Sequence, residues 1–152
     1  MPVEIGAVAP EFELRDQHGQ MVRLADFRGR KNVVLVFYPY AFTRVCTSEM
    51  CAIRDELPAF QSDQVQVLAI STDTVFALRV FAEQLGLEFP LLSDFWPHGA
   101  VARSYGVFDE LRGCVVRGTF IVGRDGALRW SVVNAIPDAR NQAEYLKVLG
   151  AL

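Results

Sequence analysis

The sequence has few of the features that would place it in a membrane or on a nucleic acid. None of its apolar runs approaches the roughly 18 residues that a membrane-spanning helix requires. Its net charge of −3 provides no basic surface for a nucleic acid. The N-terminal segment MPVEIGAVAP has neither a basic start nor a continuous apolar stretch, so we expect no secretory signal and a cytoplasmic location. We therefore expect small molecules and other proteins as partners, with no nucleic acid and no membrane among them.

Cysteine and histidine are scarce as well. The chain has three cysteines, and this odd number argues against a structural disulfide framework and for reduced thiols, at least one of them reactive. His18 and His98 form no metal-binding spacing with the cysteines, since the sequence has neither a C-x-x-C nor an H-x-x-x-H motif. We therefore predict no metal site and no other cofactor.

The composition suits one domain that covers residues 1–152, because 51% of the residues are hydrophobic and no linker or repeat interrupts the chain. Short apolar or alternating runs predict its strands. Two of these runs flank Gly19 and predict an N-terminal β-hairpin, and two others flank residues 124–126 and predict a second hairpin. The runs are FELR, QMVRL, NVVLVFY, VQVLAIS, RGTFIV and ALRWSVV, with a short extended piece at 89–92.

Apolar residues at helical spacing occur between these strands. Alternating strands and helices are typical of an α/β domain, in which helices cover both faces of a central parallel or mixed sheet. Pro58 is expected to end or kink the first helix, which follows Thr43. The other predicted helices are one capped by the cluster at 71–74 and stopped by Gly86, a short one that ends near Tyr105, and a closing helix over 139–152.

The stretch FYPYAFTRVCTSEMCAIR, residues 37–54, joins a predicted strand to the first predicted helix. Thr43 is placed at the N-cap of this helix, and Glu49 follows in its first turns, where the helix dipole favours negative charge. Unpaired N–H groups at a helix start stabilise a thiolate, the form of cysteine that attacks and leaves. Cys46 is expected to face inward there, because it begins an apolar stripe at helical spacing. The stripe comprises Cys46, Met50, Ile53, Leu57 and Phe60.

Burial in a core is the commonest state of a free cysteine, but Cys46 belongs to a larger motif. Pro39, Thr43 and Cys46 fit the pattern P-x-x-x-T-x-x-C of the peroxiredoxins, which the chain resembles over essentially its whole length. Glu49, three residues after the cysteine, and Arg117, in the strand-like VVRGTFIV, continue the match. The segments IGAVAP, LLSDFWPHG and YGV look most like the AhpE branch, the alkyl hydroperoxide reductase E-like members of the family.

This resemblance implies a thioredoxin-like fold with a central mixed β-sheet and the activity of a thiol-specific peroxidase. Such an enzyme reduces hydrogen peroxide, organic hydroperoxides and peroxynitrite through a cysteine sulfenic acid, here on Cys46. A thioredoxin-, glutaredoxin- or mycoredoxin-like donor then restores the thiol. The resemblance also implies a homodimer.

The resemblance assigns further roles around Cys46. A more stable thiolate is also a weaker nucleophile, so the rate must come from groups that bind the peroxide and the charge growing on its departing oxygen. The hydroxyl of Thr43 can accept a hydrogen bond from the peroxide, and the guanidinium of Arg117 can donate to its oxygens. Backbone N–H groups at Val45 and Cys46 complete this cradle, and Pro39 excludes water from it.

Simpler interpretations exist for several of these residues. Arg117 is also compatible with an ordinary surface charge on a strand, and without the resemblance that interpretation would be preferred. Glu49 is either an ordinary helix residue or a group that orients a charged neighbour. Phe42 is either a core or interface aromatic or part of the pocket mouth, and the same alternatives hold for Tyr38, Phe95 and Trp96.

The other two cysteines raise the question of which thiol resolves the sulfenic acid. Cys51, five residues after Cys46, is similar in placement to the resolving cysteine of the Q-type, or bacterioferritin-comigratory, branch. On an intact helix the two Cα atoms would lie about 8.6 Å apart. A disulfide needs less than about 7 Å, so we predict that the first turns unwind and that Cys51 then condenses with the Cys46 sulfenic acid. The alternative is a bystander Cys51, with Cys46 resolved by an outside thiol. Cys114 is interpreted as buried filler and as a reserve candidate for the disulfide.

Two other functions compete with the peroxidase. A thioredoxin-like disulfide oxidoreductase is disfavoured, because its chemistry uses C-x-x-C and here four residues separate the two cysteines of the helix. A redox sensor or holdase would form the same sulfenic acid without turnover, and the sequence does not separate it from an enzyme.

Overall fold

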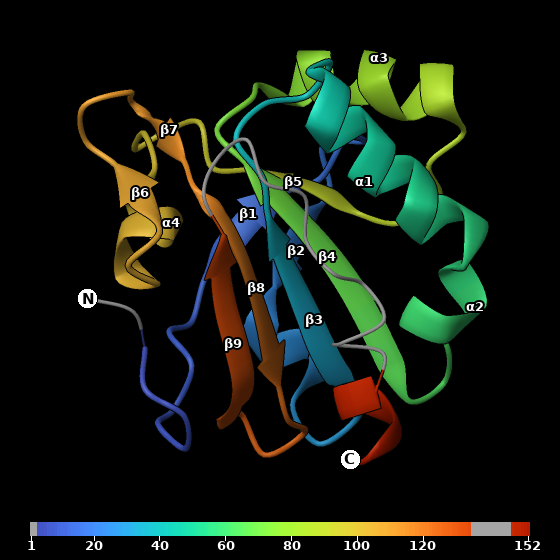
Figure 1. The fold of residues 1–152 in the computed structure, drawn as a ribbon, viewed down its shortest axis with the longest axis vertical. Helices are drawn as coiled ribbons and strands as arrows, with labels where there is room; N and C mark the ends of the chain where they lie inside the picture. The colour runs from blue at the N-terminus through green and yellow to red at the C-terminus, as the bar shows by residue number, and fades with distance from the viewer. Residues whose placement is uncertain (1–2, 135–146) are drawn as a thin grey trace.

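The computed structural model describes residues 3–134 and 147–152. Seven strands form a central mixed sheet in the order β2-β1-β5-β4-β3-β8-β9, as Figure 1 shows. Strands β3, β4 and β5 are parallel, while β8 pairs antiparallel with both β3 and β9. The strands are β1 (Glu13–Arg15), β2 (Met21–Arg23), β3 (Asn32–Phe37), β4 (Val65–Ser71), β5 (Leu91–Ser93), β8 (Arg117–Val122) and β9 (Leu128–Asn134).

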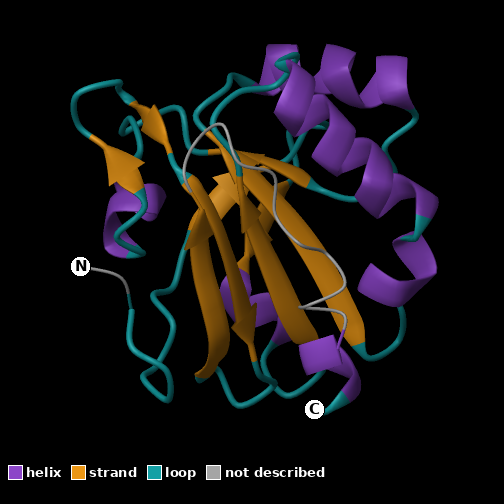
Figure 2. Ribbon diagram, in the orientation of Figure 1, coloured by secondary structure: helices purple, strands orange, loops and turns teal. Residues whose placement is uncertain are grey.

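Helices cover both faces of this sheet, as predicted. Helices α1 (Arg44–Asp55), α2 (Leu57–Phe60) and α3 (Val75–Leu85) lie on one side in Figure 2, and α4 (Ala100–Ser104) lies on the other. Alternate residues of β3 enter the two cores, with Val34 on the α1 side and Leu35 on the α4 side. This explains why the run NVVLVFY is continuously apolar, since a strand buried on both faces has no solvent side.

Both predicted hairpins are present. Strands β1 and β2 pair antiparallel around a turn in which Gly19 has φ +79, a left-handed conformation that glycine adopts without a steric penalty. Strands β8 and β9 pair around residues 123–127. A further small hairpin, β6 (Phe108–Asp109) and β7 (Cys114–Val115), was not predicted, because two-residue strands leave no periodic pattern.

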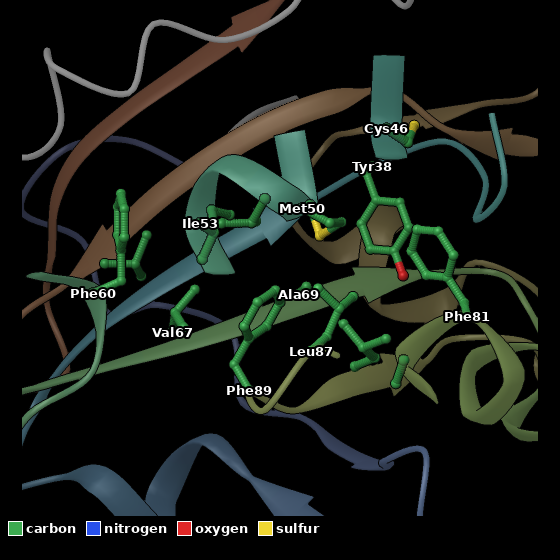
Figure 3. Packing of buried hydrophobic residues seen from close by; sticks show 14 of the residues in the cluster. Tyr38, Cys46, Met50, Ile53, Phe60, Val67, Ala69, Phe81, Leu87 and Phe89 are labelled. Atoms are coloured by element: carbon green, nitrogen blue, oxygen red, sulfur yellow. The ribbon is translucent and has the colours of Figure 1, made fainter. Parts of the chain in front are cut away.

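The first helix ends where Pro58 required it to end. Helix α1 stops at Asp55, and Pro58 lies in the first turn of the short helix α2, where its missing N–H costs no hydrogen bond. The predicted stripe is therefore correct for Cys46, Met50 and Ile53, which face the sheet in Figure 3. Phe60 is also buried in this core, but it belongs to the separate helix α2.

Helices α3 and α4 are where the sequence predicted them, whereas the short 3-10 helix at Leu24–Phe27 was not predicted. Thr74 caps α3 by accepting a hydrogen bond from the Ala77 N–H at 3.2 Å, and Gly86 ends that helix in a left-handed conformation. Residues 147–150 are helical, whereas positions 139–146 of the predicted closing helix lie outside the described residues. No helix in the described ranges is long and apolar enough to cross a membrane.

Candidate active site

The loop between β3 and α1 delivers Cys46 to a helix start. Tyr38 and Pro39 are buried directly after the strand, and the chain then turns at Phe42. Phe42 has φ +70, a left-handed conformation that costs a residue other than glycine roughly 1–2 kcal/mol. Helix α1 begins two residues later at Arg44, so Cys46 is its third residue.

Cys46 is fully buried and lies in the first turn, as predicted. The first hydrogen bond of the helix runs from the Thr47 N–H to the Thr43 carbonyl at 2.8 Å. The N–H groups of Val45 and Cys46 come before that bond and therefore have no acceptor within the helix. They are the backbone donors that the sequence analysis placed in the peroxide cradle.

Arg117 lies against the sulfur of Cys46. It is the first residue of β8, only 2% exposed, and its Nη2 donates to the Cys46 Sγ at 3.4 Å. The interpretation of Arg117 as an ordinary surface charge is therefore wrong. Strand β8 pairs with β3 so that Gly118 is opposite Phe37, and this register brings Arg117 to the edge from which the Cys46 loop emerges.

Glu49 is the partner of this arginine. The Glu49 carboxylate is 4% exposed and forms an ion pair with Nη1 of Arg117. Glu49 and Cys46 are three residues apart on α1, so they share a face and meet the same guanidinium. Glu49 lies in the second turn, and no acidic residue occupies the first turn. Its described ion pair is thus with Arg117, so Glu49 holds the guanidinium in place.

Thr43 occupies the N-cap position, but its side chain does not cap the helix. Its hydroxyl donates to the Tyr40 carbonyl at 3.0 Å instead. The predicted position is correct and the expected capping bond is not present. Because the O–H is directed into the loop, the oxygen lone pairs of Thr43 are the part of the hydroxyl available to accept a hydrogen bond from a peroxide.

Phe42 lies at the surface beside the loop. Its side chain is 52% exposed, and its ring packs against Phe81 of α3 with 5.1 Å between the centroids. Its exposure argues against a core role and leaves both the pocket-mouth and the interface interpretations open. Val45 is half-buried.

The three cysteines are free, and the structure does not bring Cys51 onto the face of Cys46. Cys51 is half-buried on α1, off the stripe of residues that face the sheet. Cys114, in β7, is 2% exposed, and burial raises the pKa of its thiol. Among the described residues, no three His, Cys, Asp or Glu side chains gather as a metal-binding group.

A polar contact beneath the loop escaped the sequence analysis. Asp73 lies between β4 and α3, and its Oδ2 accepts hydrogen bonds from the Ala41 N–H at 2.8 Å and from the Ser71 hydroxyl at 2.7 Å. The sequence signal was an acid two residues after a buried strand. It was interpreted only as part of the cap of α3, because a contact with a residue 32 positions earlier leaves no local pattern.

Comparison with known proteins places this chain in a family. The AhpC/TSA family matches residues 5–131. The chain is 47% identical to alkyl hydroperoxide reductase E of Mycobacterium tuberculosis over 150 residues, which is 99% of this chain and 98% of that protein. It is 34% identical to the chloroplastic 2-Cys peroxiredoxin BAS1 of Spinacia oleracea, covering 97% of this chain and 59% of that protein.

Solved structures agree with this result. Reduced 2-Cys peroxiredoxin of Plasmodium vivax superimposes with a TM-score of 0.88 at 27% identity, over 99% of this chain and 82% of that chain. Peroxidoxin BcpB of Mycobacterium tuberculosis gives a TM-score of 0.87 at 34% identity, over 98% and 97% of the two chains. The predicted thioredoxin-like α/β fold is thereby confirmed.

Proposed function

The chain belongs to the AhpC/TSA family of peroxiredoxin peroxidases, and we propose that as a single domain it reduces peroxides at Cys46. The observation that carries this assignment is the buried Arg117, which donates to the Cys46 sulfur while Glu49 holds its other nitrogen. Burying a charged guanidinium requires compensation, so an arginine is not expected beside a cysteine that only fills the core. Beside a reactive cysteine, the guanidinium can bind the oxygens of the peroxide.

The first step is a displacement at oxygen. The Cys46 thiolate attacks one oxygen of the hydroperoxide, an S–O bond forms, the O–O bond breaks, and the departing oxygen leaves as an alcohol or water after it takes a proton. Arg117 and the N–H groups of residues 45 and 46 stabilise the charge on the oxygens during this step. Thr43 accepts the peroxide O–H, which orients the substrate. Pro39 excludes water.

The burial of the sulfur limits the substrates. Because Cys46 is fully buried in the described structure, a protein thiol cannot reach it there. Hydrogen peroxide, small organic hydroperoxides and peroxynitrite are the substrates we propose. A thioredoxin-, glutaredoxin- or mycoredoxin-like donor then needs a later, exposed form of the oxidised cysteine.

We propose that Cys51 provides that form. It attacks the Cys46 sulfenic acid, an S–S bond forms, the S–O bond breaks, and water leaves. Cys51 is half-buried on the same helix, whereas Cys114 is 2% exposed in β7 and burial raises the pKa of its thiol. The helical separation of about 8.6 Å exceeds the reach of a disulfide, so the first turns of α1 must unwind.

One equivalent of peroxide is expected to give an intramolecular Cys46–Cys51 disulfide. Peptide mapping by mass spectrometry under non-reducing conditions measures it directly. Cys51→Ser should then stop at the sulfenic acid, which a dimedone-type probe detects, and Cys114→Ser should still form the disulfide. A sulfenic acid that persists in the parent, or a Cys46–Cys114 peptide, would show that Cys51 does not resolve Cys46.

Stoichiometry tests the proposed activity itself. With an excess of dithiothreitol the protein should consume many equivalents of hydrogen peroxide, because each cycle regenerates the Cys46 thiol. Consumption that ends after about one equivalent would instead identify a redox sensor without turnover.

We also propose a homodimer, supported by an apolar groove on one face. The groove has a volume of about 630 Å³ and lies between the N-terminal hairpin, the start of α3 and the loop after β5. Phe76 and Trp96, 75% and 80% exposed, both line this groove, and exposed apolar side chains that gather in one patch mark protein–protein contact sites. A two-fold contact would bury both residues in each copy.

Light scattering after size exclusion should therefore give the mass of a dimer for the parent protein. Trp96→Glu should shift it towards the monomer, because a charge in an apolar contact is costly. Leu111→Glu is the matched control, since Leu111 is 99% exposed and lies outside the groove. A parent that elutes as a monomer would refute the dimer.

A further inference from the structure

Asp73 connects the peroxide-binding loop to the neighbouring secondary structure, and we infer that it is a positioning residue for peroxide reduction. This inference rests on the proposed function of Cys46. Asp73 makes no described contact with the sulfur. Its Oδ2 instead accepts the Ala41 N–H at 2.8 Å, in the middle of the loop that carries Pro39 and Thr43. A hydrogen bond to a carboxylate is stronger than one between neutral groups.

The loop needs such an anchor because its own geometry is unfavourable. Phe42, the next residue after Ala41, has φ +70, a conformation that residues other than glycine rarely adopt. Such a conformation persists only where surrounding contacts impose it. Two described contacts reach the loop here from the α3 side, the Asp73 carboxylate on Ala41 and the Phe81 ring on Phe42.

Asp73 is itself held from three elements, which makes it a fixed point. The Ser71 hydroxyl, at the end of β4, donates to the same Oδ2 at 2.7 Å, and the Asp73 N–H donates back to it at 3.3 Å. The Ser93 hydroxyl, at the end of β5, donates to the Asp73 carbonyl at 2.6 Å. Thr74, the next residue, caps α3. The Ala41 N–H is therefore fixed relative to β4, β5 and α3.

The position of Ala41 determines the position of Thr43. Only Phe42 separates them, and the Thr43 hydroxyl donates to the Tyr40 carbonyl on the other side of Ala41 at 3.0 Å. If Ala41 loses its anchor, the oxygen of Thr43 moves relative to the Cys46 sulfur, while the contact between Arg117 and the sulfur does not depend on Asp73. Peroxide binding should then weaken although the cysteine remains intact.

The test compares two reactions of the same thiol in Asp73→Ala and the parent. Stopped-flow oxidation by hydrogen peroxide should slow by roughly tenfold or more. Alkylation of Cys46 by iodoacetamide, which needs no Thr43, should stay within about twofold. In steady-state assays the loss should appear in kcat/KM for peroxide, and kcat/KM for the reductant should not change.

Three further variants support this comparison. Asp73→Asn keeps an oxygen acceptor for Ala41 and should restore the peroxide rate to within about threefold of the parent. Asp73→Ser replaces the carboxylate by a side chain that is too short to reach Ala41, so it should also slow oxidation by peroxide. It serves as the test if Asp73→Ala does not fold. Asp125→Ala is the matched control, because Asp125 accepts the Ala127 N–H at 3.0 Å in the turn after β8, and it should match the parent.

The outcomes separate the inference from the proposed function. A parent that is not oxidised by peroxide at Cys46 refutes the proposed function and with it the inference. A fast parent with an equally fast Asp73→Ala protein refutes the inference alone. Equal losses of oxidation and alkylation also refute it, since they indicate a general structural role, as does an asparagine variant as slow as the alanine variant.

Discussion

Cys46→Ser is expected to abolish peroxide consumption. A serine hydroxyl is not ionised at neutral pH, and its oxygen cannot form a sulfenic acid, so the first step has no nucleophile. The fold should be preserved, because serine is smaller than cysteine and because Cys46 lies in the first turn of α1, at the end of the buried stripe. Peroxide remaining in the presence of excess dithiothreitol measures the effect.

The other two cysteines provide matched controls for this substitution. Cys114→Ser should retain the parent rate of peroxide consumption with dithiothreitol, since Cys114 takes no part in either proposed step. Cys51→Ser should retain the rapid first oxidation in a single turnover. If Cys46→Ser still consumed peroxide at a tenth of the parent rate or faster, the nucleophile would have to be another residue.

Removing the guanidinium of Arg117 is expected to slow the oxidation of Cys46 by about a hundredfold or more. This corresponds to roughly 2.7–4 kcal/mol of transition-state stabilisation, the loss typical of one oxyanion-type donor. Arg117→Met alone removes one partner of a buried ion pair with Glu49, which costs about 3–5 kcal/mol of folding stability. The double variant Arg117→Met, Glu49→Gln avoids the unbalanced charge and is the better test.

Glu49→Gln and Arg117→Lys complete this experiment. Glu49→Gln retains the guanidinium and should lose less activity than the double variant. Arg117→Lys keeps the charge but loses the planar fork that meets both the sulfur and the carboxylate, so it should lie between the parent and the double variant. A stopped-flow rate for the double variant within threefold of the parent would leave Arg117 with a structural role alone.

The sequence predicted best those features that local patterns determine. The buried strand NVVLVFY, the turn at Gly19 and the helix start before Cys46 each depend on neighbouring residues, and each is present. The burial of Arg117 was not predictable from local pattern, because its partner Glu49 is 68 residues away and a single arginine on a strand more often faces solvent. Only the family resemblance, and not a periodic pattern, assigned Arg117 to the site.

Side-chain partners in the loop were also beyond the sequence. A threonine before a helix normally caps it, but Thr43 donates to Tyr40 because the turn at Phe42 directs its hydroxyl back into the loop. Asp73, from the separate loop between β4 and α3, accepts a hydrogen bond from the Ala41 N–H beside this turn. Backbone conformations that depend on tertiary contacts override local propensity, and functional sites are where this is expected.

Helix α1 is held by different contacts in its two halves. Its first half, through Cys46 and Glu49, depends on Arg117, whereas its second half is fixed to α3, since Arg54 donates to the Leu85 carbonyl at 2.7 Å and Ile53 is fully buried. Cys51 lies at the boundary between the halves. The disulfide that we propose therefore requires only the first half to open, which breaks the contacts with Arg117, while the second half keeps its contact with α3. Reduction would then refold only about two turns.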